Sequence, residues 1–365
     1  MNKTKKFFCE FDETTKTKLT ILEEYLKKWL PVFINTKASY IYIFDFFAGP
    51  GCDSKGYNGS PIITLKQIQK YLHIISGTKI YLFLNDNKKQ NFTNLKTNCE
   101  TYLRSNPVLN DIIKCEYFNE LFENSFKELK DKIGKYPSLV FMDQFGVKYA
   151  KYIKEFENFN TTDFMIFISS SSLRRFAKTS EFKNALSLDD VEIKKLKNTP
   201  YKLIHECVKK ILESRLCQTT KLKLYCFSLK KGRNIYGLVF GTKNISAADK
   251  FLHIAWGLNP NNGMANYDIY GDKDKTQATL FPDLMGKTTL QLFQDEFKDK
   301  ILSEKIKTNL EAYLYTLDKG FLPKHAKEVL QNLKNDGKIN YKAKSPLISY
   351  KTIYRNKRII NYEKN

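Results

Sequence analysis

The sequence predicts an α/β protein with a doubly wound, Rossmann-like sheet, followed by a small C-terminal domain. Five strand-like segments alternate with helix-like segments, which is typical of parallel sheets. Two more strand-like segments follow one another across a tight turn, as in a β-hairpin. From about residue 295 the pattern changes to closely spaced helices. We therefore expect a domain boundary at that position.

The first expected elements are a helix, a strand and a second helix. Leucines at helical spacing place the first helix at 14–33. The strand YIYIFD then ends at Asp45 and continues into the Ala-Gly-Pro-Gly turn. Ser60 is expected to cap the second helix, with Pro61 at its first position.

The remaining elements complete the sheet. We expect strands at 79–86, 112–119, 138–146 and 163–172, a helix at 202–216, and a hairpin of strands at 221–231 and 234–244. Five parallel strands that end in a hairpin are typical of the class I methyltransferase sheet. A nicotinamide-binding Rossmann fold does not usually end in that way.

The C-terminal pattern indicates a winged helix-turn-helix. Helices are expected at 301–317 and 323–337, and wing strands at 337–344 and 356–364. The expected organisation is a methyltransferase-like domain at 1–294, with its sheet core at 38–245 and a polar, loop-like connection at 253–294, and a winged-helix domain at 295–365. Residues 298–365 contain 16 Lys and Arg against 7 Asp and Glu, a net charge of +9.

The composition favours a polyanionic partner. The 61 Lys and Arg exceed the 39 Asp and Glu by 22, which favours nucleic acid first and an anionic membrane second. A proteome rich in Lys, Asn and Ile would produce the same excess. The seven cysteines form no CxxC pair and no metal-ligand spacing, so we expect free thiols, no metal site and a reducing compartment. Since no apolar run approaches ~18 residues, we expect a cytoplasmic protein that does not contact membranes.

Three predicted strands end in acidic residues, namely Asp45, Asp86 and Asp143. The carboxyl ends of parallel strands share one edge of a sheet, where doubly wound folds bind nucleotide cofactors. Asp86 is suited to accept both ribose hydroxyls, which disfavours a ribose phosphate, and Asn119 is suited to reach an adenine. GxGxxG and Walker motifs are absent. The predicted cofactor is therefore S-adenosylmethionine (SAM), bound by Asp45, Phe47, Ala48, Gly49, Pro50, Gly51, Asp86 and Asn119. Taken alone, the glycine turn fits a tight corner equally well.

The tetrapeptide Asp143-Gln144-Phe145-Gly146 follows the fourth strand, where amine methyltransferases place their catalytic residues. Asp143 is suited to polarise an amine and Phe145 to hold a base. A buried strand end with a helix-capping aspartate is the alternative. A cytosine-C5 mechanism is disfavoured because the sequence has no Pro-Cys dipeptide.

Basic residues at two places are candidates for nucleic-acid contacts. Arg174 and Arg175 follow the fifth strand, and the tail interleaves basic residues with tyrosines. The tail candidates are Lys338, Lys342, Arg355 and Arg358. A solvated arginine pair and a solvated Lys-rich hairpin remain open as alternatives.

The chain resembles the three-Cys-motif partner proteins of bacteria. The resemblance is based on KTKLTILEEYLKKWL, YIFDFFAGPG, NGSP, the strand-end DQFG and HIAWGLNPNNGMANYDI, and it extends over nearly the whole chain. It implies a class I methyltransferase-like domain with a winged helix, a context of mobile elements or phage defence, and a partner that resembles radical-SAM enzymes. Asp143, Phe145 and Gly146 match the family's DP[FY]G tetrapeptide, whereas Gln144 replaces its proline.

The expected function is a SAM-dependent methyltransferase that acts on DNA or RNA, at an exocyclic amine of a base. Asp143, Phe145 and Gly146 are the expected catalytic residues. Gln144 favours an alternative, in which the fold is a catalytically inactive module that binds nucleic acid or acts as a sensor with a partner protein. A third possibility is methylation of the partner protein itself.

Overall fold

The structure is a computed structural model that describes residues 10–144, 146–275 and 286–365. The chain divides into two compact units, Met1–Ala247 and Ala248–Asn365. The predicted domain boundary at 295 falls inside a helix of the second unit and stays a prediction. Among the described residues, no helix has the length and apolar character needed to cross a membrane.

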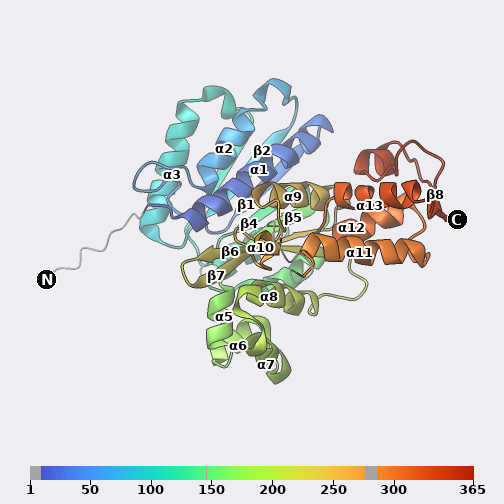
Figure 1. Cartoon of the computed structure of the whole chain (residues 1–365). Helices are drawn as coiled ribbons and strands as arrows, with labels where there is room; N and C mark the ends of the chain where they lie inside the picture. Colours follow the sequence, from blue (N-terminus) through green and yellow to red (C-terminus); the bar gives the residue numbers. More distant parts are fainter. Residues whose placement is uncertain (1–9, 145, 276–285) are drawn as a thin grey trace. The chain divides into compact units, whose positions relative to one another are not determined.

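The first unit is built on a seven-stranded sheet with the order β3-β2-β1-β4-β5-β7-β6 (Figure 1). Strands β1 to β5 are parallel, and β7 runs antiparallel to both β5 and β6. The bounds are β1 Tyr40–Asp45, β2 Lys79–Asn85, β3 Ile113–Phe118, β4 Ser138–Met142, β5 Thr162–Ile168, β6 Lys223–Lys231 and β7 Asn234–Thr242. This order confirms the predicted class I methyltransferase sheet with its terminal hairpin.

Helices cover the sheet because its central strands are apolar on both faces; every residue of β4 and β5 is buried. Helix α2 packs against α1 on one side and α3 on the other, and α8 packs on β6 and β7. The bounds are α1 Glu13–Asn35, α2 Ser60–Gln69, α3 Lys89–Arg104, α4 Phe122–Leu129 and α8 Ile204–Glu213. Short 3-10 turns lie at Leu72–Ile74, Pro107–Leu109, Ala150–Glu157 and Tyr201–Leu203.

Helix α1 is fixed to the sheet by a buried polar cluster. The Tyr25 hydroxyl and the Trp29 Nε1–H both donate to Oδ2 of Asp163, over 2.8 and 2.9 Å, and Asp163 lies near the start of β5. Asp163 is 6% exposed, so these donors offset the cost of burying its carboxylate. The middle of α1 is thereby held at a defined place over the sheet.

The segment between β5 and β6 differs from the prediction. The fifth strand ends at Ile168, and Ser170–Phe176 form helix α5, so Arg174 and Arg175 lie on a helix instead of at a strand end. Two further helices, α6 (Ser180–Leu186) and α7 (Asp190–Asn198), were not predicted. Together α5, α6 and α7 form a helical insertion at the lower end of Figure 1.

The second unit is mainly helical. Its elements are α9 Ile245–Leu258, α10 Asp272–Lys275, α11 Thr289–Leu302, α12 Asn309–Asp318, α13 Pro323–Asn335, a π-helical turn at Lys351–Arg355, and the strands β8 Ile339–Asn340 and β9 Glu363–Lys364. The helix–helix–hairpin order of a winged helix is confirmed in α12, α13 and the β8–β9 pair.

Three expectations for this unit are wrong in detail. The helix expected at 301–317 is broken after Leu302, because Glu304 has a positive φ of 57° and Thr308 starts α12 with a capping box. Residues 253–258 are helical and not loop-like, since Trp256 and its apolar neighbours are buried at helical spacing. The wing strands shorten to two residues each.

Candidate functional site

The turn after β1, Ala48–Gly51, is held by hydrogen bonds from two other elements. The Ala48 N–H donates to the Asn85 carbonyl at 2.9 Å, and the Asn98 amide of α3 donates to the Pro50 carbonyl at 2.8 Å. Gly49 and Gly51 have φ values of 62° and 87°, which favour glycine. A Cβ on Gly49 would meet no atom within 4 Å, so open space borders the turn.

Asp86, directly after β2, is bound to this turn. Its carboxylate accepts hydrogen bonds from the Gly49 N–H (3.1 Å), the Lys88 N–H (2.9 Å) and the Asn91 amide (3.3 Å), and the residue is 8% exposed. A carboxylate accepts about four hydrogen bonds. Asp86 therefore fixes the glycine turn and keeps capacity for about one more donor, whereas the sequence led us to expect two ribose hydroxyls there.

Asp45, the last residue of β1, is 4% exposed. It accepts hydrogen bonds from the Ser60 hydroxyl at 2.5 Å and from the Phe47 N–H at 3.2 Å. Burial raises the pKa of Asp45 to about 7; the two hydrogen bonds oppose this rise, and the carboxylates of Asp143 and Asp86 add to it. The expectation that Ser60 caps α2 is wrong, because Gly59 is the N-cap and the Ser60 hydroxyl is engaged by Asp45.

The other predicted cofactor residues surround the same turn. Asn119 follows β3 and is exposed, and its amide donates to the Asp86 carbonyl at 2.7 Å. The Phe47 ring stacks on Phe122 of α4, with ring centroids 5.5 Å apart. All predicted cofactor residues thus lie at the ends of β1, β2 and β3, which we call the cofactor half of the edge. Their binding role stays a prediction.

Asp143, directly after β4, forms an ion pair with Lys18 of α1 (Nζ to Oδ1, 2.6 Å). Lys18 is partly buried, with 14% of its side chain exposed, and its ammonium lies 4.6 Å from the centroid of the Phe167 ring. The pair borders a cavity of about 300 Å³. The cavity is lined by α1, by the ends of β4 and β5 and by the hairpin, through residues that include Thr14, Lys18, Asp143, Gln144, Ser169 and Tyr236. We call these strand ends the substrate half.

Gln144 is 5% exposed and lines the same cavity. Its Oε1 accepts a hydrogen bond from the Tyr149 N–H at 2.8 Å, which fixes the orientation of the amide. Its buried Nε2 has no hydrogen-bond partner among the described residues. Gly146 follows with a φ of 87°, and its carbonyl accepts from the Ser169 N–H. Phe145, the third predicted catalytic residue, lies outside the described residues.

The two predicted arginines have different surroundings. The Arg174 guanidinium donates to the Lys197 carbonyl at 2.8 Å and lies 5.4 Å from the Tyr201 ring centroid. Arg175 is exposed and donates to Oδ1 of Asn234 at 3.1 Å. Arg174 is therefore engaged within the protein, whereas Arg175 remains accessible. A nucleic-acid contact by either residue stays a prediction.

The tail candidates Lys338, Lys342, Arg355 and Arg358 are all exposed. Residues 338–365 contain eight Lys and Arg and one Glu, a net charge of 8 − 1 = +7. Among the described side chains, Lys338 alone of these eight has a carboxylate partner, Asp336 at 3.5 Å. This surface is therefore strongly basic. Its binding role also stays a prediction.

Sequence reasoning missed two residues that shape the edge, Lys18 and Asn98, and it gave Ser60 a different role. Lys18 had a detectable signal, since it lies four residues before Leu22 on the apolar face of α1, where an unpaired lysine is unfavourable. Ser60 and Asn98 had none, because their partners are set by tertiary packing. In the described part of the chain, no group of three or more His, Cys, Asp or Glu side chains could hold a metal ion.

One family model and several solved structures match parts of the chain. Residues 269–346 match the model of the GMT-like wHTH domain. None of the curated proteins matches the chain. The solved structures that match include a putative O-methyltransferase from Klebsiella pneumoniae (9% identity, TM-score 0.31). They also include the O-methyltransferase TomG from Streptomyces achromogenes, involved in tomaymycin synthesis and solved in complex with SAM (10% identity, TM-score 0.30). Each comparison covers 64% of this chain and 90% of the other chain.

At these TM-scores the fold assignment rests on the strand order and not on the similarity. The first unit therefore has a class I methyltransferase fold, and the second contains a winged helix-turn-helix.

Proposed function

We propose that this protein is a SAM-dependent methyltransferase that acts on nucleic acid, at an exocyclic amine of a base. The observation that carries the proposal is the arrangement of the carboxyl edge. Asp45, Asp86 and the glycine turn form one half of it, and Asp143 and a cavity form the other. An edge with a cofactor half beside a substrate cavity suits group transfer between two bound molecules.

The residues of the cofactor half fit SAM by their chemistry. In the described part of the chain, neither Asp45 nor Asp86 forms an ion pair, so two buried carboxylates face this half without a cation. Such a site suits a positively charged, phosphate-free nucleoside better than a dinucleotide. SAM, when bound, supplies an electrophilic methyl group. In this assignment the Asp45 carboxylate accepts a hydrogen bond from the amino group of SAM, and the Asp86 carboxylate accepts one from a ribose hydroxyl. Asn119 contacts the adenine.

Asp143 is assigned to the acceptor amine. Lys18 holds Oδ1 of its carboxylate, which leaves Oδ2 to accept a hydrogen bond from the amine and to take up the proton that the amine loses. The Lys18 ammonium fixes the carboxylate in one orientation. Positioning of this kind is worth several kcal/mol when the reacting atoms lie near contact distance.

Gln144 is assigned to the same base. A buried donor without a partner costs about 1–3 kcal/mol, and an acceptor on the substrate would remove that cost. Adenine and cytosine both present a ring nitrogen acceptor beside the exocyclic amine. Asp143 and Gln144 together would then recognise the donor–acceptor edge of such a base.

The second unit is assigned to substrate binding. Winged helices place their second helix of the helix-turn-helix, here α13, against nucleic acid. The outward residues of α13 are polar and exposed: Lys324, Lys327, Glu328, Gln331, Asn332 and Asn335. The basic 338–365 segment would add phosphate contacts. The partner protein and the phage-defence context that the family resemblance implies remain part of this proposal.

A second candidate function is a catalytically inactive module that binds nucleic acid. The ion pair of Lys18 with Asp143 and the Gln144 replacement favour it. A methyl-transfer assay distinguishes the two functions: the purified chain is incubated with SAM carrying a labelled methyl group and with DNA, RNA or cell lysate. Transfer that Asp143→Asn abolishes supports the enzyme. Cofactor binding without transfer to any of these acceptors supports the inactive module.

A further inference from the structure

A second hollow lies in the first unit, on the helical insertion between β5 and β6. Its volume is about 510 Å³, larger than the cavity beside Asp143. Among the described residues, the lining contains four lysines, Lys178, Lys183, Lys194 and Lys197, and one carboxylate, Asp190. We call it the lysine hollow. It belongs neither to the carboxyl edge nor to the winged helix.

The lysine hollow has an unbalanced charge. Lys183 pairs with Asp190 at 3.3 Å, but the Asp190 side chain is 93% exposed, so this pair contributes little. Lys178, Lys194 and Lys197 have no carboxylate partner among the side chains that the structure describes. Like charges gathered in a concave surface repel one another and attract a polyanion.

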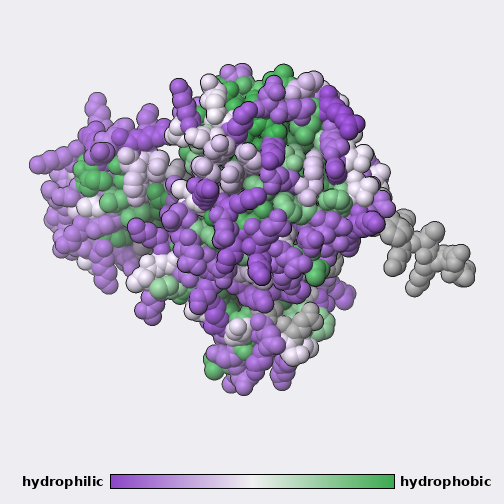
Figure 2. Space-filling model, turned by 180° about the vertical axis from the view of Figure 1, so that it is seen from behind, coloured by the Kyte–Doolittle hydropathy of each residue, from purple (hydrophilic) through white to green (hydrophobic). Residues whose placement is uncertain are grey.

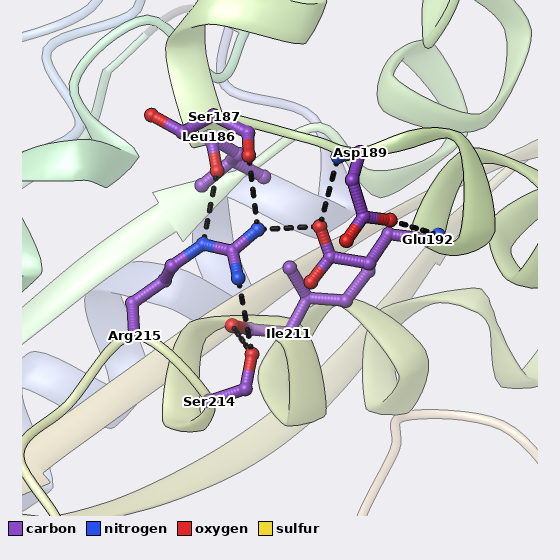
Figure 3. Close-up of polar contacts among 7 residues, drawn as sticks. All are labelled: Leu186, Ser187, Asp189, Glu192, Ile211, Ser214 and Arg215. Carbon is purple, nitrogen blue, oxygen red and sulfur yellow. Dashed lines mark hydrogen bonds and ion pairs between the residues drawn. The ribbon is translucent and has the colours of Figure 1, made fainter.

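Polar contacts join the helices around the hollow, and Figure 3 draws these contacts. The Arg215 guanidinium donates to the carbonyls of Leu186 (3.3 Å) and Ser187 (3.1 Å) at the end of α6, and it pairs with Glu192 of α7. Asp189 and Glu192 also form the capping box that starts α7. Because Glu192 is bound to Arg215, it is not available to neutralise the lysines.

The same helices connect the hollow to the candidate site. Helix α5 begins two residues after β5, and Ser169 and Ser172 at its start line the cavity beside Asp143. At its other end, Arg174 binds the Lys197 carbonyl and so joins α5 to the end of α7. A polymer that reaches the cavity along α5 would therefore meet the lysine hollow.

We propose that the lysine hollow binds the sugar–phosphate backbone of the nucleic acid whose base enters the cavity beside Asp143. The choice of nucleic acid as the polyanion rests on the proposed function. We expect contacts to phosphates and not to bases, because no aromatic side chain is among the described residues that line the hollow. Most exposed side chains on the face drawn in Figure 2 are hydrophilic, as expected of a protein that meets a polar polymer.

The test compares two triple variants of the full chain, Lys178/Lys194/Lys197→Ala and Lys127/Lys130/Lys135→Ala. All six lysines are exposed, and the second set lies on and after α4, so both variants lose the same charge. Affinity for a labelled, mixed-sequence single-stranded oligonucleotide is measured by fluorescence anisotropy between about 50 and 200 mM salt. Thermal unfolding of both variants checks that they remain folded.

The slope of log K against log salt is negative, and each lost phosphate contact makes it shallower by ~0.7 for a single strand. For the hollow variant, the slope is expected to be shallower by about 2 than in the wild type. Its affinity at low salt should fall by about tenfold or more. The control variant should keep the slope within about 0.5. Equal slopes for the two variants would overturn the proposal. The assay needs no methyl transfer, so a protein that binds SAM poorly or lacks catalysis leaves this readout intact.

Discussion

The two halves of the carboxyl edge are built in different ways. In the cofactor half, the Asp86 carboxylate accepts three hydrogen bonds from the protein and the glycine turn is held by Asn85 and Asn98. In the substrate half, Asp143 has one ion pair with a lysine from a distant helix, and the Gln144 Nε2 has no partner among the described residues. In the cofactor half most polar groups are paired within the protein, whereas the substrate half keeps polar groups available for a ligand.

The difference shows where binding energy can be gained. A site whose polar groups are already paired is preorganised, so a ligand there loses little free energy in ordering the protein. A site with a half-paired carboxylate and an unpaired amide gains when a ligand with matching groups arrives. We therefore expect the cofactor half to set affinity for SAM and the substrate half to set the choice and rate of the acceptor.

The largest effect is expected from Asp143→Asn. Loss of the carboxylate removes the acceptor for the amine proton, and methyl transfer should fall by ~10²–10⁴-fold. Affinity for SAM should stay within about twofold, since Asp143 lies in the other half. Single-turnover transfer and calorimetric titration measure the two quantities. A fall of less than tenfold in transfer would show that Asp143 is not the catalytic residue.

Asp86→Ala should act on the opposite half. Three donors, including the Gly49 and Lys88 N–H groups, lose their acceptor, which costs about 3 kcal/mol of folding stability and shifts the glycine turn. SAM affinity should fall about 100-fold. Asp131→Ala, at an exposed position on the same unit, is the matched control and should change neither quantity. Unchanged SAM affinity in Asp86→Ala would contradict the assignment of this half.

Asp45→Asn should remove a pH dependence. The native pKa of about 7 lies above the ordinary 3.8, so the native state holds a proton between about pH 4 and 7 that the unfolded chain has released. The stability contributed by Asp45 is complete below pH ~4 and is lost as the pH rises to ~7, by at most about 4 kcal/mol. Thermal unfolding at acidic and alkaline pH should show this loss in the wild type and not in Asp45→Asn.

The ionisation of Asp45 should also control the affinity for SAM, which should increase as the pH rises whereas the stability decreases. An ionised Asp45 binds the amino group of SAM better, so affinity should rise about tenfold between pH 6 and 8. Ser60, the Phe47 N–H, Asp143 and Asp86 are the neighbours that influence this titration. Equal pH profiles for the wild type and Asp45→Asn would show that another group is responsible.

Gln144→Met is expected to have the smallest effect. The change removes the unpaired Nε2 but also the acceptor of the Tyr149 N–H, so the two effects on stability, each about 1 kcal/mol, nearly cancel. The kcat/KM for the acceptor should fall about tenfold, or ~1.4 kcal/mol. A loss of stability with unchanged kcat/KM would make Gln144 a structural residue only.

The sequence was sufficient for the sheet and for the acidic residues at its edge. Period-2 and period-3.6 patterns located the strands and helices, and acidic residues at strand ends pointed to one edge because parallel strands share it. The terminal hairpin then distinguished the methyltransferase order from other doubly wound sheets. These features depend on local sequence, and local sequence is what such patterns record.

The parts that could not be predicted depend on contacts between distant residues. Lys18 and Asp143 are 125 residues apart in the chain, and no local pattern connects them. Ser60 is of a residue type that commonly caps helices, yet its hydroxyl donates a hydrogen bond to Asp45. Helix α7 had a local signal, the capping box of Asp189 and Glu192, but helices of seven to nine residues give a weak periodic pattern.

The most direct test of the central claim is a calorimetric titration of the full chain with SAM, alongside Asp86→Ala. We expect one bound SAM per chain, with an affinity that rises from pH 6 to 8 and falls about 100-fold in the variant. Absence of any binding heat at millimolar SAM would contradict the claim that this edge is a cofactor site.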